Sequence, residues 1–171
     1  TLALPERRPS PGARGRLWQA LARATQAPPL SGEEQAPSAG RLAAFFDIPE
    51  PQAAHFLGTL DDAAGWLSIP GPGAGQLQAV SVGPGRAGQM GMLVRFPAGF
   101  RMPRHQHRGS ERALVLRGGF RSSEGATYHP GDEAWSEADD SHELYVLPDG
   151  ECALALLLRE GIEFRQEPEE G

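Results

Sequence analysis

The chain has 171 residues and a formal net charge of −6, and it is rich in glycine and proline, with 22 and 16 of each. This length favours one domain with a proper core and a modest appendage, and it leaves little room for two full domains. The single cysteine, Cys152, excludes an internal disulfide framework and a cysteine-based zinc site, so we expect a buried thiol within its apolar run.

The charges are arranged in blocks. Residues 1–30 hold five Arg and one Glu, residues 31–75 one Arg and six acids, residues 76–121 eight Arg and one Glu, and residues 122–171 two Arg and fourteen acids. We expect these blocks to pair within one fold or across subunits. No apolar run approaches the roughly 18 residues of a membrane span and no signal-peptide pattern is present, so we expect a cytoplasmic protein with no membrane partner.

The first part of the chain is predicted to be helical. Residues 1–15 are polar and broken by Pro and Gly, which predicts a flexible start. Residues 16–70 form a predicted helical segment, with apolar residues at helical spacing in three stretches: Arg16–Ala27, Arg41–Asp47 and Pro51–Leu60. No basic residue lies between Arg41 and Arg86, which argues against a DNA-binding helix-turn-helix and any other nucleic-acid partner.

From residue 76 onward, short apolar or alternating runs replace the helical pattern, and Gly-Pro and Pro-Gly turns separate them. The runs are Gln76–Val82, Gln89–Phe96, Arg112–Leu116, Asp132–Trp135, Glu143–Leu147 and Ala153–Leu158. Short strands at near-regular spacing predict a mainly β fold, an antiparallel sandwich or barrel over residues 76–165, followed by a tail at 166–171.

One stretch of this region carries metal-binding chemistry. In GFRMPRHQHRGSERALVLRG, residues 99–118, His105 and His107 are two positions apart, so on a strand both side chains leave the same face. Glu111 follows after a Gly109-Ser110 turn. Imidazole and carboxylate groups are ligands for divalent Zn, Mn, Fe, Ni or Cu, so we expect these three residues to hold a metal ion.

The spacing Gly99, His105, His107, Glu111, Gly118 resembles the first motif of the cupin superfamily. The resemblance implies a cupin jelly-roll barrel with a metal ion inside its mouth. A shortened form of the second cupin motif follows at Pro130-Gly131-Asp132, and the family's fourth ligand is a histidine near that turn. His129 lies in the turn itself, whereas His142 shares a strand face with Leu144 and Val146, so we favour His142.

Within the cupins, the run PAGFRMPRHQHRGSERALVLRGGF is most similar to the C-terminal domain of ChrR-type anti-sigma factors, and acetylacetone-cleaving dioxygenases are similar in the same region. In the anti-sigma family an N-terminal helical domain holds the sigma factor through a His-x3-Cys-x2-Cys zinc site. No cysteine precedes Cys152 in this chain, so these residues cannot form that site. The acidic helices between Gly40 and Leu67 remain the hypothesised contact for a sigma factor.

The resemblance implies two functions. The first is a metal-binding cupin, ChrR-like, that acts as a sensor or regulatory domain for a small ligand or oxidative stress. The alternative is a non-haem metal-dependent dioxygenase that acts on a small diketone, thiol or carboxylate. The metal is Zn, Fe, Mn or Ni in either case, and family habit implies a homodimer.

Two groups of side chains near the motif have alternative interpretations. Arg101, Arg104, Arg108 and Arg112 either pair with the acidic stretch Asp132–Glu143 on the barrel exterior, which we favour, or point inward and bind an anion. The aromatic residues Tyr128, Trp135 and Tyr145 are expected to fill the core, with the cavity wall as the alternative.

Overall fold

The computed structural model of the protein describes residues 36–70 and 75–164. The predicted flexible start at 1–15, the helix predicted over 16–27 and the predicted tail at 166–171 lie outside these ranges. None of the described helices combines the length and apolar character needed to cross a membrane.

The described part begins with two short helices, α2 (Ala39–Phe46) and α3 (Glu50–Gly58), and a 3-10 turn, η1 (Thr59–Asp61). The hydroxyl of Ser38 caps α2 by accepting a hydrogen bond from the backbone N–H of Arg41, at 3.2 Å. Asp47 ends the helix in a left-handed conformation with φ of 56°. The helices predicted over 41–47 and 51–60 are therefore present, with ends shifted by one or two residues.

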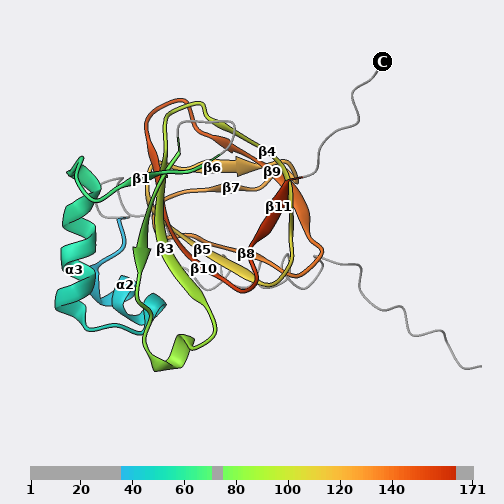
Figure 1. Ribbon diagram of the computed structural model, residues 1–171. Helices are drawn as coiled ribbons and strands as arrows, with labels where there is room; N and C mark the ends of the chain where they lie inside the picture. Colours follow the sequence, from blue (N-terminus) through green and yellow to red (C-terminus); the bar gives the residue numbers. More distant parts are fainter. Residues whose placement is uncertain (1–35, 71–74, 165–171) are drawn as a thin grey trace, which may run out of the picture.

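The rest of the described chain forms two antiparallel sheets that face each other as a barrel (Figure 1). The six-stranded sheet has the order β1-β2-β3-β10-β5-β8, and the five-stranded sheet has the order β11-β4-β9-β6-β7. The strands are β1 (Leu67–Ser68), β2 (Gln76–Val80), β3 (Met90–Phe96), β4 (Arg101–His107), β5 (Glu111–Arg117), β6 (Phe120–Ser122), β7 (Thr127–Tyr128), β8 (Glu133–Ser136), β9 (Ser141–Val146), β10 (Cys152–Leu158) and β11 (Ile162–Phe164). Each run predicted as a strand overlaps one of these elements, with ends that differ by up to two residues, so the mainly β jelly-roll fold class is confirmed.

The central strands β5 and β10 of the six-stranded sheet are buried on both faces, which explains why β10 is continuously apolar. On β10, Cys152 and Leu154 belong to the core between the two sheets, whereas Ala155 and Leu157 belong to a second core on the outer face. Burial raises the pKa of the Cys152 thiol to about 12. The cysteine is therefore the buried, protonated thiol that the sequence predicts.

The second core lies between that outer face and the helices. Figure 1 shows α2 and α3 together on one side of the barrel, next to β1 and β3. Leu42 and Phe46 of α2 are fully buried there, in one cluster with Leu93 of β3 and Leu114 of β5. The helices thus cover an apolar sheet face that would otherwise contact water.

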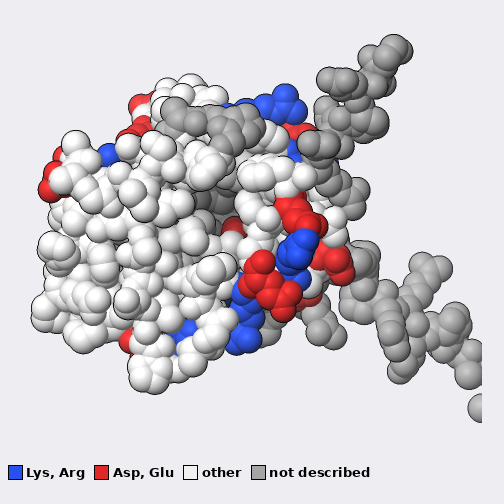
Figure 2. Space-filling view, in the orientation of Figure 1, with Lys and Arg blue, Asp and Glu red and all other residues white. Residues whose placement is uncertain are grey.

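The charged blocks of the sequence pair inside the fold. Figure 2 shows that the face formed by α2, α3, β1 and β3 is largely uncharged, whereas acidic and basic side chains gather near β8 and β11. Arg112 of β5 pairs with Glu133 of β8 at 2.9 Å, and Arg108 pairs with Glu163 of β11. The basic block at residues 76–121 and the acidic block at residues 122–171 therefore form ion pairs within one chain.

Candidate metal centre

Pairing between two strands brings the three histidines together. β4 and β9 are antiparallel, and their register places His105 directly opposite His142, after an irregularity between Met102 and His105. Because alternate residues of a strand share a face, His107 points to the same interior as His105. The two residues are 2% and 1% exposed, and His142 is half-buried.

The imidazole rings converge closely enough to share one ion. Ligand nitrogens of His105, His107 and His142 all lie within 4.8 Å of one another. The His107 and His142 rings approach through their Nε2 atoms, which are 3.3 Å apart. Two nitrogens bound at about 2.0–2.1 Å to one tetrahedral zinc ion would be separated by about 3.3–3.4 Å. The spacing therefore fits two ligands of one metal ion.

A hydrogen bond orients the third ring. The Nδ1 atom of His105 lies 3.0 Å from the carbonyl oxygen of Pro103, which can only accept a hydrogen. Nδ1 therefore carries the proton, and the Nε2 lone pair of His105 is left for a metal. Such a backbone partner on the other ring nitrogen is the usual support of a metal-binding histidine.

Glu111 begins β5 and lies beside this group without belonging to it. Its Oε2 atom is 3.7 Å from Nδ1 of His107, a nitrogen that is buried and has no hydrogen-bond partner among the described residues. The side chain of Glu111 is 16% exposed. One carboxylate thus borders three imidazoles, which is a donor set that suits a divalent ion.

Burial shifts the pKa values of these groups so that all of them favour their neutral forms. It lowers the pKa of His107 to about 3, with help from His142 and His105, and it lowers the pKa of His142 to about 4, with help from His105 and Arg104. Burial also lowers the pKa of His105. The same effect raises the pKa of Glu111 to about 7. Neutral imidazoles are the metal-binding form of histidine, so the three rings are ready for an ion at neutral pH.

His129, the alternative fourth ligand, lies elsewhere. It is exposed in the turn before Pro130, and its backbone N–H donates to Asp132 Oδ2 at 2.9 Å. It is not one of the clustered histidines. The structure therefore groups His142, and not His129, with His105 and His107.

Comparison with known proteins assigns the family. The family described as the ChrR cupin-like domain matches residues 57–160, which is more than half of the chain. The chain belongs to the ChrR cupin-like family. No curated protein matches it significantly in sequence.

Solved structures share the fold of this ChrR cupin-like chain at low sequence identity. An RmlC-like cupin protein from Ralstonia eutropha JMP134 is 21% identical over 60% of this chain and 67% of its own, with a TM-score of 0.52. The structure of Rhodobacter sphaeroides SigE in complex with the anti-sigma ChrR is 20% identical over 86% of this chain and 77% of its own, with a TM-score of 0.53. An acetylacetone dioxygenase from Acinetobacter johnsonii is 14% identical over 62% of this chain and 75% of its own, with a TM-score of 0.53.

In this ChrR cupin-like barrel the arginines of the motif pair with acids instead of entering the site. Arg101 and Arg104 pair with Glu143 of β9, at 2.7 and 3.8 Å. Arg112 pairs with Glu133, as expected, whereas Arg108 pairs with Glu163, which lies outside the predicted acidic stretch. The pairing that we favoured from the sequence is therefore found for three of the four arginines.

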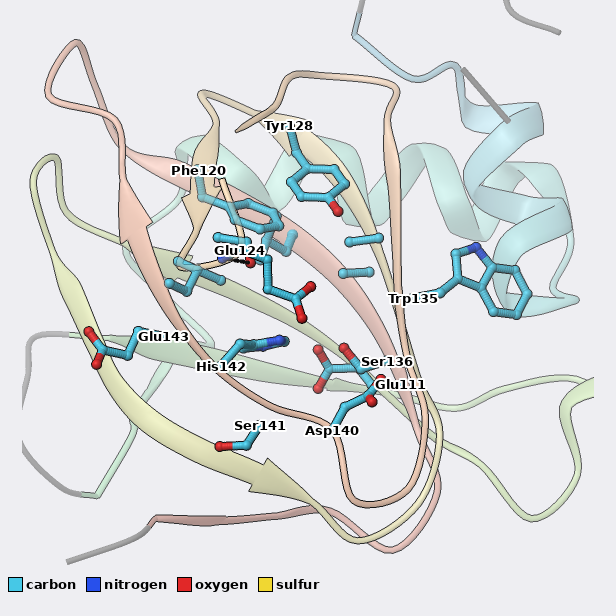
Figure 3. Close-up of a pocket in the computed structure, with 15 residues that line it drawn as sticks. Glu111, Phe120, Glu124, Tyr128, Trp135, Ser136, Asp140, Ser141, His142 and Glu143 are labelled. Atoms are coloured by element: carbon cyan, nitrogen blue, oxygen red, sulfur yellow. Dashed lines mark hydrogen bonds between the residues drawn. The ribbon is translucent and has the colours of Figure 1, made fainter. Parts of the chain in front are cut away.

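A cavity adjoins the cluster on the side of Glu111 and His142 (Figure 3). Its volume is about 40 Å³, enough for about three water molecules. Polar and aromatic side chains line it beside an apolar floor: Ser122, Glu124, Tyr128, Trp135, Ser136 and Asp140. The candidate ion would therefore be reachable by a small molecule.

The aromatic residues do not all behave as predicted. Tyr128 is buried in the core, as expected, and also lines the cavity. Trp135 is 37% exposed, with Arg112 stacked 4.3 Å from its ring centroid, so the core assignment was wrong for it. Tyr145 was also wrongly assigned, because its hydroxyl points to Glu143 Oε2 on the exterior, at 2.5 Å.

Sequence reasoning also missed polar residues of the cavity wall. Ser136 pairs directly with Glu111 across β5 and β8, and Glu124 comes from the turn between β6 and β7. Neither belongs to a motif: strand register places Ser136 opposite Glu111, and the turn between β6 and β7 places Glu124 on the cavity wall. From the sequence, only a correct prediction of how the strands pair would have placed these residues at the cavity.

Proposed function

We propose that His105, His107, His142 and Glu111 hold one divalent metal ion. The observation that carries this proposal is the convergence of three neutral imidazoles within 4.8 Å of one another. The buried, unpartnered Nδ1 of His107 and the adjacent carboxylate of Glu111 support a centre that lacks a positive charge. Nitrogen and oxygen donors without sulfur suit Zn, Fe, Mn or Ni.

The proposed role of the metal-loaded barrel, residues 76–165, is that of a sensor or regulatory domain for a small ligand or oxidant. A bound ion would supply a Lewis-acid centre with open coordination positions. The chain's own residues would contribute a cavity beside Glu111 and His142 that admits a small molecule. Membership of the ChrR cupin-like family supports this role.

A sigma factor is the proposed macromolecular partner, through the helical segment at residues 16–70. The likeness to ChrR in its complex with SigE supports this, because it covers 86% of the chain and so includes residues outside the barrel. A pull-down with the whole chain fused to an affinity tag would test it. No sigma factor retained by the whole chain would contradict the proposal.

An alternative function is a metal-dependent dioxygenase. The same cavity provides access for a substrate, and the acetylacetone dioxygenase shares the fold. Metal analysis of protein purified without added metal, followed by oxygen uptake with β-diketones and thiols, separates the two functions. Stoichiometric zinc without uptake favours the sensor, whereas iron with substrate-dependent uptake favours the enzyme.

Alanine variants test the proposed ligands. His105→Ala, His107→Ala, Glu111→Ala and His142→Ala should each lower the metal content, because each removes one donor and typically weakens binding by an order of magnitude or more. His129→Ala is the matched control and should keep full metal content. Metal loss in the control alone, measured by mass spectrometry of the purified proteins, would contradict the ligand assignment.

We also propose that the protein is a cytoplasmic homodimer. Sedimentation of the purified chain at several concentrations would test the dimer, and a monomer at all concentrations would contradict it.

A further inference from the structure

One side of the proposed metal centre is closed by the last described strand, β11. It is the edge strand of the five-stranded sheet, and among the described strands it pairs only with β4. The register places Ile162 opposite His107 and Phe164 opposite His105. Because directly opposite residues share a face of the sheet, Ile162 and Phe164 point to the same interior as the two histidines. Figure 1 shows β11 on the side of the barrel away from α2 and α3.

The ring of Phe164 lies against the imidazole of His105. The two ring centroids are 6.1 Å apart, and the rings meet edge to face at 61°. On the other side of His105, the centroid of the His142 ring is 4.6 Å away. The three rings therefore form a row across β11, β4 and β9, with His105 in the middle.

The exposure of these side chains shows which of them borders water. Phe164 is 46% exposed, whereas His105 is 2% exposed and His107 is 1% exposed. No described strand lies beyond β11 at this edge of the sheet. Phe164 therefore stands between the imidazole of His105 and the solvent, with one side of its ring on the histidine and the rest of the ring exposed.

The local sequence fixes β11 in this place. Glu160 and Gly161 have φ values of 64° and 83°, and these two left-handed residues turn the chain sharply between β10 and β11. The backbone N–H of Arg108 donates to the Gly161 carbonyl at 3.0 Å, and the Arg108 side chain pairs with Glu163. The strand is thus anchored beside β4 from its first residue onward.

The cavity described above lies on a different side of the centre. The residues that line it belong to β5 to β10 and the turns between them, and none belongs to β4 or β11. Figure 3 shows the ring of His142 extending into this cavity. The centre therefore has one side that opens into a partly polar cavity and another side that an apolar edge strand closes.

We infer that Phe164 gates the metal ion: its ring closes the β11 side of the centre and slows entry and release of the ion without binding it. The apolar shell around a metal site controls the access of solvent to that site. Removal of the ring would open a second path, at the sheet edge beside His105, in addition to the path through the cavity. This inference rests on the proposed metal centre, because the gate acts on an ion held by His105 and its neighbours.

The test is the rate at which excess chelator removes zinc from the zinc-loaded full chain, at chelator concentrations where the rate has become constant. Phe164→Ala should release zinc about tenfold faster than wild type, the low end of the usual effect of a change around metal ligands. Zinc uptake by the metal-free chain should accelerate similarly, so the dissociation constant, the ratio of the two rates, should stay the same within about threefold. Phe164→Leu keeps an apolar side chain at the gate and should release zinc at nearly the wild-type rate.

A matched variant and a stability measurement separate the gate from general effects. Leu67→Ala removes an apolar side chain that is 66% exposed on β1, in the other sheet, and it should leave the release rate unchanged. In chelator, Phe164→Ala should unfold at nearly the same urea concentration as wild type, so that unfolding does not account for the faster release.

The possible outcomes are distinguishable. Release from Phe164→Ala at the wild-type rate would overturn this inference alone. Faster release with an equal loss of affinity and no faster uptake would also overturn it, because Phe164 would then orient the ligand His105 instead of controlling access. Wild-type protein that retains no zinc would overturn the metal centre and the inference together.

Discussion

At the scale of single residues, the candidate site consists of groups that burial keeps uncharged. The imidazoles of His107 and His142 have pKa values of about 3 and 4, and the carboxyl group of Glu111 has a pKa of about 7. Desolvation is the main cause in each case, and it acts in opposite directions on bases and acids. Without a metal ion, an ionised Glu111 therefore destabilises the folded state at neutral pH.

This destabilisation predicts that Glu111→Gln changes the stability of the metal-free protein in a pH-dependent way. The folded-state pKa of about 7 lies above the ordinary value of 4.5, so the stability linked to neutral Glu111 is complete below pH 4.5 and is lost as pH rises through 7. At pH 8 the variant should be more stable than wild type by about 3 kcal/mol. The difference should vanish near pH 4.5, as measured by urea unfolding in chelator.

Zinc should reverse the order at pH 8, because ionised Glu111 then faces an ion and the variant loses a ligand. The exposed residue Glu160 provides a matched control, since Glu160→Gln should change stability little at either pH. A variant less stable than wild type in chelator at pH 8 would contradict the burial of an uncompensated carboxyl group.

Glycines explain part of the motif that the ligands do not. Gly99 and Gly118 have φ values of 72° and 68°, in the left-handed region that favours glycine. A side chain at Gly118 would also meet the carbonyl oxygen of Glu151 at 2.2 Å. The sequence therefore predicted the ligand strand β4, the turn at Gly99 before it and the turn at Gly118 after β5, because all of these depend on local backbone geometry.

At the scale of elements, the helices are part of the barrel's core and not an attachment to it. The loop after β2 holds the end of α2: Arg86 Nε donates to the Phe45 carbonyl at 2.8 Å, and the Gly85 N–H donates to Asp47 Oδ2 at 2.6 Å. Phe46 is fully buried against the six-stranded sheet. Release of α2 would expose that sheet face to water, so the helices and the barrel should unfold together.

Phe46→Ala tests this coupling. It should lower the free energy of unfolding by about 3–5 kcal/mol, the cost of a cavity in a packed core, in a single transition seen by circular dichroism and tryptophan fluorescence. Phe164→Ala is the matched control, because Phe164 is 46% exposed and should cost about 1 kcal/mol or less. Two separate transitions in wild type would show that the helices are an independent unit.

Elements also show where sequence reasoning succeeds and where it stops. Periodicity predicted α2, α3 and the long strands, because each must bury an apolar face. The strands β1, β6, β7 and β11 have at most three residues, too few for a pattern, and were not predicted. Ser136 was missed because the register between β5 and β8, not local sequence, places it beside Glu111, and Glu124 was missed because it reaches the cavity from a turn.

At the scale of the whole molecule, the alternating charge blocks become ion pairs across the fold. The basic block at 76–121 supplies Arg117, which pairs with Asp61 of the preceding acidic block at 2.9 Å, and Arg112, which pairs with Glu133 of the following one. Exposed pairs of this kind contribute little stability. They pair these two arginines with acids, and the described lining of the cavity beside the candidate metal centre contains no Arg.

The proposed ion would link β4, β5 and β9 and should therefore stabilise the entire chain. A ligand at about a thousand times its dissociation constant adds about 4 kcal/mol, which for a chain of this length corresponds to a rise in melting temperature of about 8–16 °C. In scanning calorimetry, a chelator should remove this rise in melting temperature from wild type and from His129→Ala. His142→Ala should show a smaller zinc-dependent rise than wild type, lower by about 1.4 kcal/mol of stabilisation for each tenfold loss of affinity, because His142 on β9 completes the cluster with the two histidines of β4. A zinc-dependent rise in His142→Ala equal to that of wild type would place the ion elsewhere in the molecule.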